Sequence, residues 1–199
     1  PNPLANAYGE SDALAPFRLL IGYGPENMYL AANQFFAPGL PTAVFDRFHN
    51  YPYDLITTVG LLGFGLIFCL WLLLFYQSNR QLDLLQSKTD QIIFWSVLGG
   101  SVLAATLGAG LLLGWPFVGV GFQFGWMTAF ILFPLIQVLR QYQPSLFAFS
   151  ESSVFIAALL AALVGHGVEI AFSFQAVTTM VFFWGFVGLL LVLNRRCAN

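Results

Sequence analysis

The sequence contains few charged residues. Asp, Glu, Lys and Arg make up 8% of the 199 residues, whereas 58% are hydrophobic. An average soluble domain carries about 25% charged residues. This composition excludes an ordinary soluble domain and indicates an integral membrane protein. The formal net charge of −2 excludes nucleic acid as a partner, because such partners require a basic surface.

Cysteine is also scarce. Cys69 lies in an apolar run and Cys197 lies at the chain end, which indicates neither a disulfide nor a metal site. Two histidines and scattered carboxylates lack the spacing of metal ligands, so we expect no metal and no other cofactor. The sequence has no initiator Met and no signal-peptide pattern at its start. "PNPLANAYGE" reads like the middle of a protein, and we expect an upstream part.

Long apolar runs, by contrast, are abundant. A bilayer core requires about 20 apolar residues per helix. Their length and continuous apolarity predict helices rather than strands. We expect an all-α membrane protein in which an outer-face loop segment with short amphipathic helices (1–50) precedes a five-helix transmembrane bundle (51–199). The five expected spans are 54–76, 91–113, 117–139, 153–172 and 175–193.

Positively charged residues predict the orientation. With five spans, most of the cations fall in loops on one side, which should be the cytoplasm. The N-terminal segment then lies outside and the C-terminus inside. The cations on the predicted inner side are Arg80, Lys88, Arg140, Arg195 and Arg196.

Small residues recur four positions apart in two spans. Such spacing permits close helix contact. We expect helix contacts through Gly100, Ala104 and Gly108 in the second span, and through Gly121 and Gly125 in the third.

Polar side chains crowd the position where the chain enters the first span, in "VFDRFHNYPYD". His49 titrates near neutral pH and can accept a proton from a hydroxyl. Asn50 and Asp54 could orient it or bind a sugar hydroxyl. The alternative is that these residues simply contact interfacial water.

Two arginines and a Gly-rich turn add candidate groups for binding an anion. Arg18 and Arg47 carry planar guanidinium groups that suit phosphate oxygens. Gly22 and Gly24, in "GYGPENMY", permit unusual backbone angles, and their amides could bind an anion. An ordinary turn that leads into a helix explains the same residues.

A second cluster lies near the outer end of the fourth span. His166 and Glu169 are three residues apart and share a helix face. Ionisable residues within a span are candidates for function, although both lie close enough to the boundary to contact water.

The order of these motifs resembles that of the O-antigen ligase and polymerase family of bacterial membrane proteins. That family has a Gly-x-Gly turn in a large outer loop, then a His-Asn pair, an Asp and a Gly-Leu-Leu-Gly helix start. Here these are Gly22 and Gly24, His49-Asn50, Asp54 and "GLLG" at 60–63. The run "GHGVEI" at 165–170 also looks like a branch of the family.

The resemblance implies a metal-independent, inverting glycosyltransferase with a GT-C-like helical bundle in the bacterial inner (cytoplasmic) membrane. Its donor would be a glycan on a polyprenyl diphosphate, and its acceptor would be a glycan, a lipid or a protein. His49 matches the essential histidine of the family, and Arg18 matches a diphosphate-binding arginine more closely than Arg47 does.

The chain departs from the family in two ways. It has five spans rather than about a dozen, as if it were the C-terminal portion, and Tyr51-Pro52 alters the stretch that follows the His-Asn pair. Two other functions therefore stay open. One is a non-catalytic structural or accessory subunit that binds other membrane subunits or a missing N-terminal half. The other is a transporter, which would require more ionisable residues deep in the spans.

Overall fold

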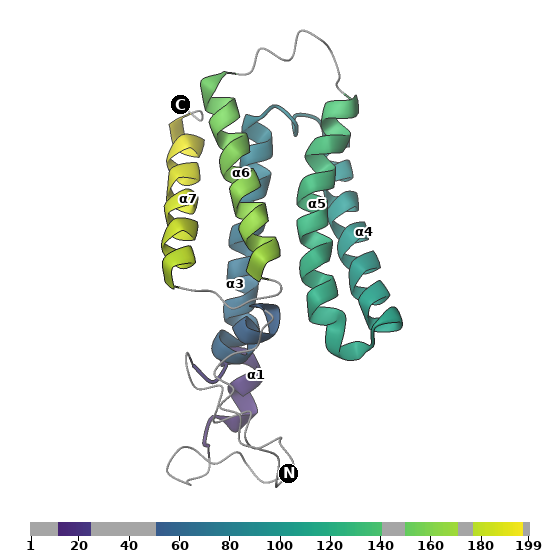
Figure 1. The fold of residues 1–199 in the computed structure, drawn as a ribbon, viewed down its shortest axis with the longest axis vertical. Coiled ribbons are helices and arrows are strands. Elements are labelled where there is room, and N and C mark those ends of the chain that lie inside the picture. Colours follow the sequence, from purple (N-terminus) through teal and green to yellow (C-terminus); the bar gives the residue numbers. More distant parts are fainter. Residues whose placement is uncertain (1–11, 25–50, 141–149, 171–176, 197–199) are drawn as a thin grey trace.

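The computed structural model describes residues 12–24, 51–140, 150–170 and 177–196, and every regular element in these ranges is helical. The all-α expectation is therefore confirmed for the described part. Two short 3-10 turns, η1 (Ala15–Phe17) and η2 (Trp115–Phe117), lead into α1 (Arg18–Ile21) and α5. The long helices of the bundle (Figure 1) are α3 (Tyr51–Gln81), α4 (Lys88–Leu112), α5 (Val118–Arg140), α6 (Glu151–Ile170) and α7 (Val177–Arg196).

The long helices are those of a multi-pass membrane protein. Among the described residues, α3, α4, α5 with η2, and α6 are each long and apolar enough to cross a bilayer. The apolar part of α7, Met180–Leu193, is shorter, so the predicted fifth crossing stays a prediction. The helix bounds lie within a few residues of the expected spans at most ends.

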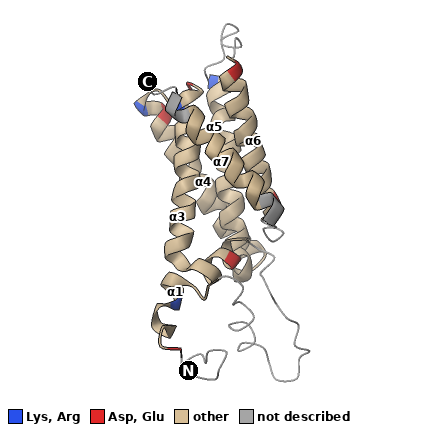
Figure 2. Ribbon diagram, turned by 90° about the vertical axis from the view of Figure 1, so that its left-hand side faces the viewer, with Lys and Arg blue, Asp and Glu red and all other residues tan. Residues whose placement is uncertain are grey.

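The cationic loops lie at one end of the bundle, which we call the cationic end (Arg80, Lys88 and Arg140). There α3 ends, α4 begins and α5 ends, and α7 reaches the same level, whereas α1 lies at the opposite end (Figure 1). In Figure 2 the ribbon segments coloured blue (Lys and Arg) and red (Asp and Glu) lie mainly at this end. Which side of a membrane the cationic end faces stays a prediction.

Aromatic rings form much of the core. The Trp71 ring of α3 contacts Trp126 of α5 edge-on at 5.0 Å between centroids and lies 5.4 Å from Phe183 of α7. Phe75 of α3 stacks on Phe130 of α5 at 3.7 Å. Edge-on and offset ring pairs stabilise beyond their buried area by about 0.5–1.5 kcal/mol each. These contacts hold α3, α5 and α7 together.

Glycines bring α4 and α5 into direct contact. A Cβ at Gly121 would lie 2.5 Å from the Ala105 carbonyl oxygen, and one at Gly125 would lie 2.5 Å from the Val102 Cα. The prediction for Gly121 and Gly125 is therefore confirmed.

The corresponding prediction for the second span is wrong within the described part of the chain. Gly100 and Ala104 are exposed, and a Cβ at Gly100 or Gly108 would meet open space. The contact surface of α4 includes Ser101, Val102, Ala105 and Ala109 instead. The spacing places Gly100, Ala104 and Gly108 on one face of the helix, but spacing alone does not tell which face meets a neighbour.

A buried polar network that the sequence did not reveal joins the same two helices at the cationic end. Asp90 is 5% exposed and closes a capping box with Ser87 at the start of α4. Its other carboxylate oxygen accepts hydrogen bonds from Gln137 Nε2 at 2.9 Å and Arg140 Nη1 at 3.2 Å. These bonds satisfy a buried charge that would otherwise destabilise the fold. The sequence signal was "SKTD", a Ser-x-x-Asp N-cap pattern.

Candidate functional site at the break in helix α3

Helix α3 is broken at Gly60. The backbone of Gly60 has φ 69° and ψ −176°, which is not helical and which favours glycine strongly. The segment Tyr51–Gln81 therefore consists of two helices that meet at this residue. The "GLLG" stretch that the resemblance identified as a helix start is the first turn of the second half.

The Gly-x-Gly turn after α1 packs directly on this break. Gly22 has φ 72° and is buried. A Cβ on Gly22 would collide with the Thr58 carbonyl, and a Cβ on Gly60 would collide with the Leu20 carbonyl. Two glycines that lie 38 positions apart thus allow two backbones to touch. We call this contact the Gly22–Gly60 joint.

Hydrogen bonds complete the joint. Tyr23 N donates to Thr57 O at 2.8 Å, and Gly24 N donates to Thr58 O at 2.9 Å. A helix that breaks leaves its last carbonyls without intrahelical partners, and the turn supplies those partners here. Gly22 N donates to Arg18 O at 2.7 Å. The amides proposed to bind an anion are therefore bonded within the protein, and Gly22 and Gly24 act here through backbone shape.

Arg18, the first residue of α1, is held by contacts on both sides of that helix. Its Nε and Nη2 atoms donate to the two oxygens of Asp12 at 2.7 and 3.1 Å, and Nη1 donates to Gly22 O at 3.0 Å. The guanidinium also lies 5.3 Å from the centre of the Tyr23 ring. The fork expected to bind a diphosphate is therefore occupied by Asp12, and a phosphate would have to replace that carboxylate.

These contacts shift the pKa values of the three side chains. The hydrogen bond from Arg18 holds the pKa of Asp12 below its usual value, and the same bond raises the pKa of Arg18. Burial raises the pKa of Tyr23. At neutral pH, Asp12 and Arg18 therefore form an ion pair beside a neutral phenol.

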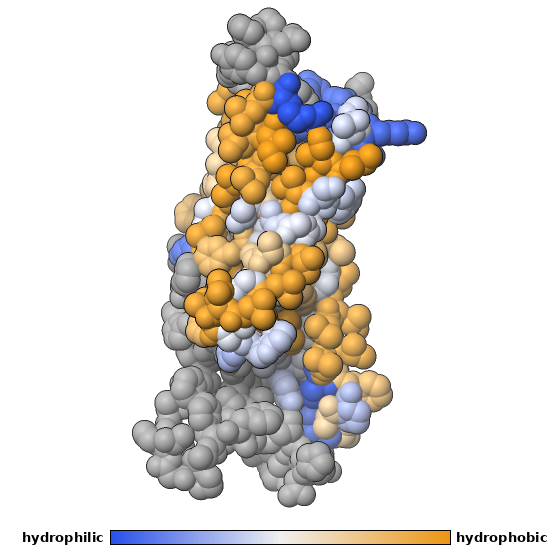
Figure 3. Space-filling model, turned by 90° about the vertical axis from the view of Figure 1, so that its right-hand side faces the viewer, coloured by the Kyte–Doolittle hydropathy of each residue, from blue (hydrophilic) through white to orange (hydrophobic). Residues whose placement is uncertain are grey.

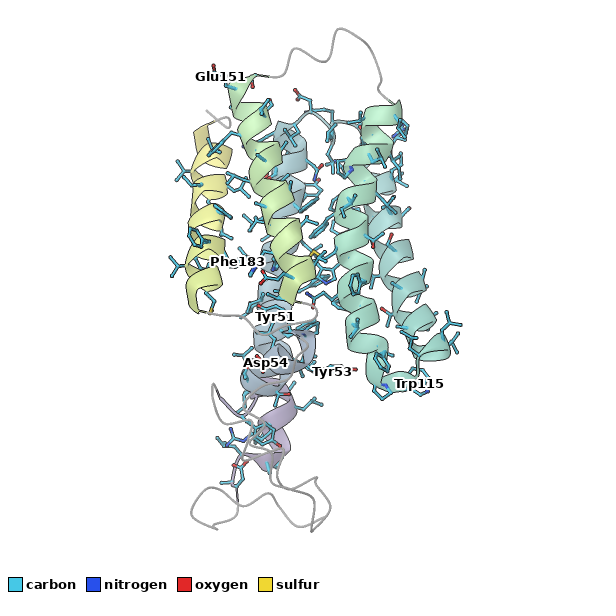
Figure 4. The ribbon with its side chains drawn as sticks, viewed as in Figure 1. Tyr51, Tyr53, Asp54, Trp115, Glu151 and Phe183 are labelled. Atoms are coloured by element: carbon cyan, nitrogen blue, oxygen red, sulfur yellow. The ribbon has the colours of Figure 1, made fainter. Side chains whose placement is uncertain are left out.

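Tyr53 ties the first half of α3 to α5, a role that the sequence did not predict. Its hydroxyl donates to Pro116 O at 2.9 Å and accepts from Gly119 N at 3.3 Å. The ring lies over Gly119, where a Cβ would be 2.8 Å from a ring carbon. Figure 4 shows Tyr53 pointing from α3 toward the foot of α5. Unlike Gly121 and Gly125, Gly119 had no partner at the spacing that predicts a helix contact, and in the sequence it is one residue of an apolar run.

The structure describes only some of the polar residues expected where the chain enters the first span. Asp54 is partly buried on the half of α3 that precedes Gly60, close to Tyr53 (Figure 4). Arg47, His49 and Asn50 lie outside the described residues. Their roles as base and binding groups stay predictions. The chain places them directly before Tyr51, at the end of α3 that carries the joint.

His166 and Glu169 do contact each other. His166 Nδ1 lies 3.2 Å from Glu169 Oε2, with 13% of the histidine side chain and 56% of the glutamate side chain exposed. His166 Nε2 is buried and has no hydrogen-bond partner among the described residues. The adjacent Gly167 O accepts a hydrogen bond from Gln123 Nε2 of α5 at 2.6 Å. Gln123 is fully buried and was not expected from the sequence.

Among the described residues, no three His, Cys, Asp or Glu side chains are grouped so as to hold a metal ion. The chain matches no protein-family model, no curated protein and no solved structure.

Proposed function

We propose that the chain is a glycosyltransferase of the O-antigen ligase type. It would transfer a glycan from a polyprenyl diphosphate to a glycan, lipid or protein acceptor at the outer face of the bacterial inner membrane. The observation that supports this proposal is the Gly22–Gly60 joint. Two motifs that the family resemblance groups together, the Gly-x-Gly turn and the Gly-Leu-Leu-Gly helix start, fit each other backbone to backbone in this chain.

The joint holds Arg18 near the segment where the chain enters the first span. It fixes α1, which carries Arg18, and the turn after it against the half of α3 that carries Asp54, and His49 and Asn50 directly precede that half in the chain. A polyprenyl diphosphate keeps its tail in lipid and its charged head at the surface. A base that serves this head must act at the depth where the chain enters the membrane.

The proposed reaction is a single displacement. His49 takes the proton from the acceptor hydroxyl, and the oxygen forms a bond to the anomeric carbon from the face opposite the diphosphate. The bond from that carbon to the diphosphate oxygen breaks, and the leaving group retains the electron pair. The diphosphate replaces the Asp12 carboxylate on the Arg18 guanidinium. Arg18 and Arg47 then stabilise the negative charge that develops on the diphosphate. The product has inverted configuration.

The test is a transfer assay with the purified full-length protein, a polyprenyl-diphosphate glycan and an acceptor. We expect product with inverted anomeric configuration by NMR, and undiminished transfer in the presence of a chelator. Arg18→Lys should lower transfer, because an ammonium does not reproduce the bidentate fork. Arg80→Lys, an exposed site at the other end, is the matched control. Retained configuration, or activity that a divalent ion restores after chelation, contradicts this mechanism.

A structural subunit of a larger membrane assembly is the second candidate. The observation that favours it is the pairing of Arg18 with Asp12, which gives the arginine a complete set of partners without substrate. A folded full-length protein that transfers no glycan, but co-purifies with other membrane subunits in fixed ratio, would support this candidate over the first.

A further inference from the structure

One face of α4 lines a shallow cleft near the cationic end. The cleft has a volume of about 590 Å³ and is lined by Lys88, Gln91, Ile92, Trp95 and Ser96. These residues recur at the spacing of a single helix face, and all are exposed. Farther along α4, Ser101, Val102 and Ala105 pack on α5. The cleft lies on an exposed part of α4, where Trp95 contacts Tyr76 of α3.

The polar part of the cleft carries one positive charge. Lys88, the single lysine of the chain, is the first residue of α4, where the helix dipole adds positive potential. Its amine makes no salt bridge to the described residues, whereas Arg140 at the same end is paired with Asp90. Gln91 and Ser96 add hydrogen-bonding groups beside it. This set suits an anion that also carries neutral oxygen acceptors.

The same face becomes apolar toward the middle of the bundle. Trp95 is 52% exposed and is fixed by its contacts with Tyr76 and Phe94. Tryptophan favours the depth of lipid headgroups. Beyond it, a Cβ at Gly99 or Gly100 would meet open space, and Leu103 is exposed. Figure 3 shows the side of the molecule that carries α4 and α5, hydrophobic over most of its length and hydrophilic at the cationic end.

We propose that this face of α4 binds one anionic phospholipid. The phosphate lies at Lys88, the backbone glycerol and ester oxygens, which lie between the phosphate and the acyl chains, accept from Gln91 and Ser96, and an acyl chain follows the shallow surface over Gly99 and Gly100 beside Trp95. A free anion would use the cation but not the apolar surface, and a zwitterionic lipid would bring its own positive group to Lys88. From Lys88 to Gly99 the helix presents a cation, an amide, an indole, a hydroxyl and then a glycine, so its polar groups give way to an apolar surface as the ester region of phosphatidylglycerol gives way to its acyl chains.

The test measures lipid retention by native mass spectrometry of the full-length protein released from detergent. The probes are phosphatidylglycerol, phosphatidylcholine with the same acyl chains, and inorganic phosphate. We expect bound phosphatidylglycerol to exceed bound phosphatidylcholine by about fivefold, since one cation near an anionic lipid surface contributes about 1 kcal/mol. Lys88→Gln should abolish this preference, and Trp95→Ala should reduce total retention of both lipids.

Two matched variants act as controls. Arg80→Gln removes an exposed cation at the same end, and Trp115→Ala removes a tryptophan that is 72% exposed at the other end of α4. Both should retain lipid as the wild type does. The proposal is wrong if Lys88→Gln keeps the preference, if Arg80→Gln loses it equally, or if inorganic phosphate displaces the lipid.

Discussion

At the scale of single residues, the Gly22–Gly60 joint requires glycine at both of its positions. Both glycines have φ near +70°, a region that disfavours other residues. A side chain at either position would also meet backbone atoms of the opposite segment, and backbone cannot move aside as a flexible side chain can. Backbone conformation and close backbone contact, rather than side-chain chemistry, therefore require glycine at these two positions.

Gly22→Ala and Gly60→Ala should each destabilise the protein. A non-glycine residue at positive φ costs about 1–3 kcal/mol, and the contact with backbone adds to this cost. Gly65→Ala, in the second half of the same helix and facing open space, is the matched control and should be neutral or slightly stabilising. Thermal unfolding in detergent, followed by circular dichroism, measures the difference. Equal melting temperatures for Gly60→Ala and Gly65→Ala would show that the joint does not form.

The Asp12–Arg18 pair predicts how α1 responds to acid. Because the folded pKa of Asp12 lies below its ordinary value of 3.8, the pair stabilises α1 fully above about pH 4. This stabilisation is lost as the pH falls through the folded pKa. Hydrogen exchange at the Tyr23 and Gly24 amides, corrected for the intrinsic effect of pH, should accelerate below pH 4. In Asp12→Asn it should already be fast at neutral pH, with no further step below pH 4. An acid step of the same size in both proteins would contradict the assignment.

At the scale of elements, the contact between α4 and α5 depends on which small residues face the neighbouring helix. Gly121→Ala should destabilise the protein by about 1–3 kcal/mol, the usual cost of overpacking a well-packed contact. Its new Cβ would lie 2.5 Å from Ala105 O and 2.6 Å from Ala109 Cβ. Gly108→Ala adds the same group in open space and should be tolerated. Detergent stability of the two variants, compared in parallel, distinguishes them. A larger loss in Gly108→Ala would mean that another surface covers that face.

The helices themselves were largely predictable. In a bilayer, a continuous apolar run of about 20 residues must satisfy its own backbone hydrogen bonds, and a helix does so within the segment. The break inside α3 was not predicted. Gly60, Gly63 and Gly65 look alike in the sequence, and only a contact with Leu20, 40 residues earlier, gives Gly60 its special conformation. The same limit applies to Asp90, whose partners Gln137 and Arg140 lie on another helix.

At the scale of the whole molecule, the predicted orientation can be tested by labelling. In a chain with Cys69 and Cys197 replaced by Ser, we introduce one cysteine at the exposed positions Ala13 or Gln86, which lie at opposite ends. An impermeant maleimide applied to intact cells should label Ala13→Cys but not Gln86→Cys, because the cationic end is expected in the cytoplasm. Both should react after permeabilisation. The reverse pattern would overturn the orientation and the outer-face site with it.

The candidate site was predictable only as a set of motifs. The order Gly-x-Gly, His-Asn, Asp and Gly-Leu-Leu-Gly supported a family resemblance but predicted no contact between the turn and the helix start, whereas the structure brings Gly22 and Gly60 together. The sequence did not indicate that Arg18 pairs with Asp12. It also did not indicate that Tyr53 hydrogen bonds to residues at the start of α5. Each depends on distances between segments that folding sets.

In the proposed reaction, His49 accepts the proton of the acceptor hydroxyl. The most direct test of this step is the rate of glycan transfer by His49→Ala and by the wild type, both as full-length protein in proteoliposomes at equal folded amounts. General base catalysis contributes about 10²–10⁴-fold in rate, so His49→Ala should lose at least about 100-fold while it inserts and unfolds as the wild type does. Transfer at the wild-type rate by a folded His49→Ala protein would contradict the account.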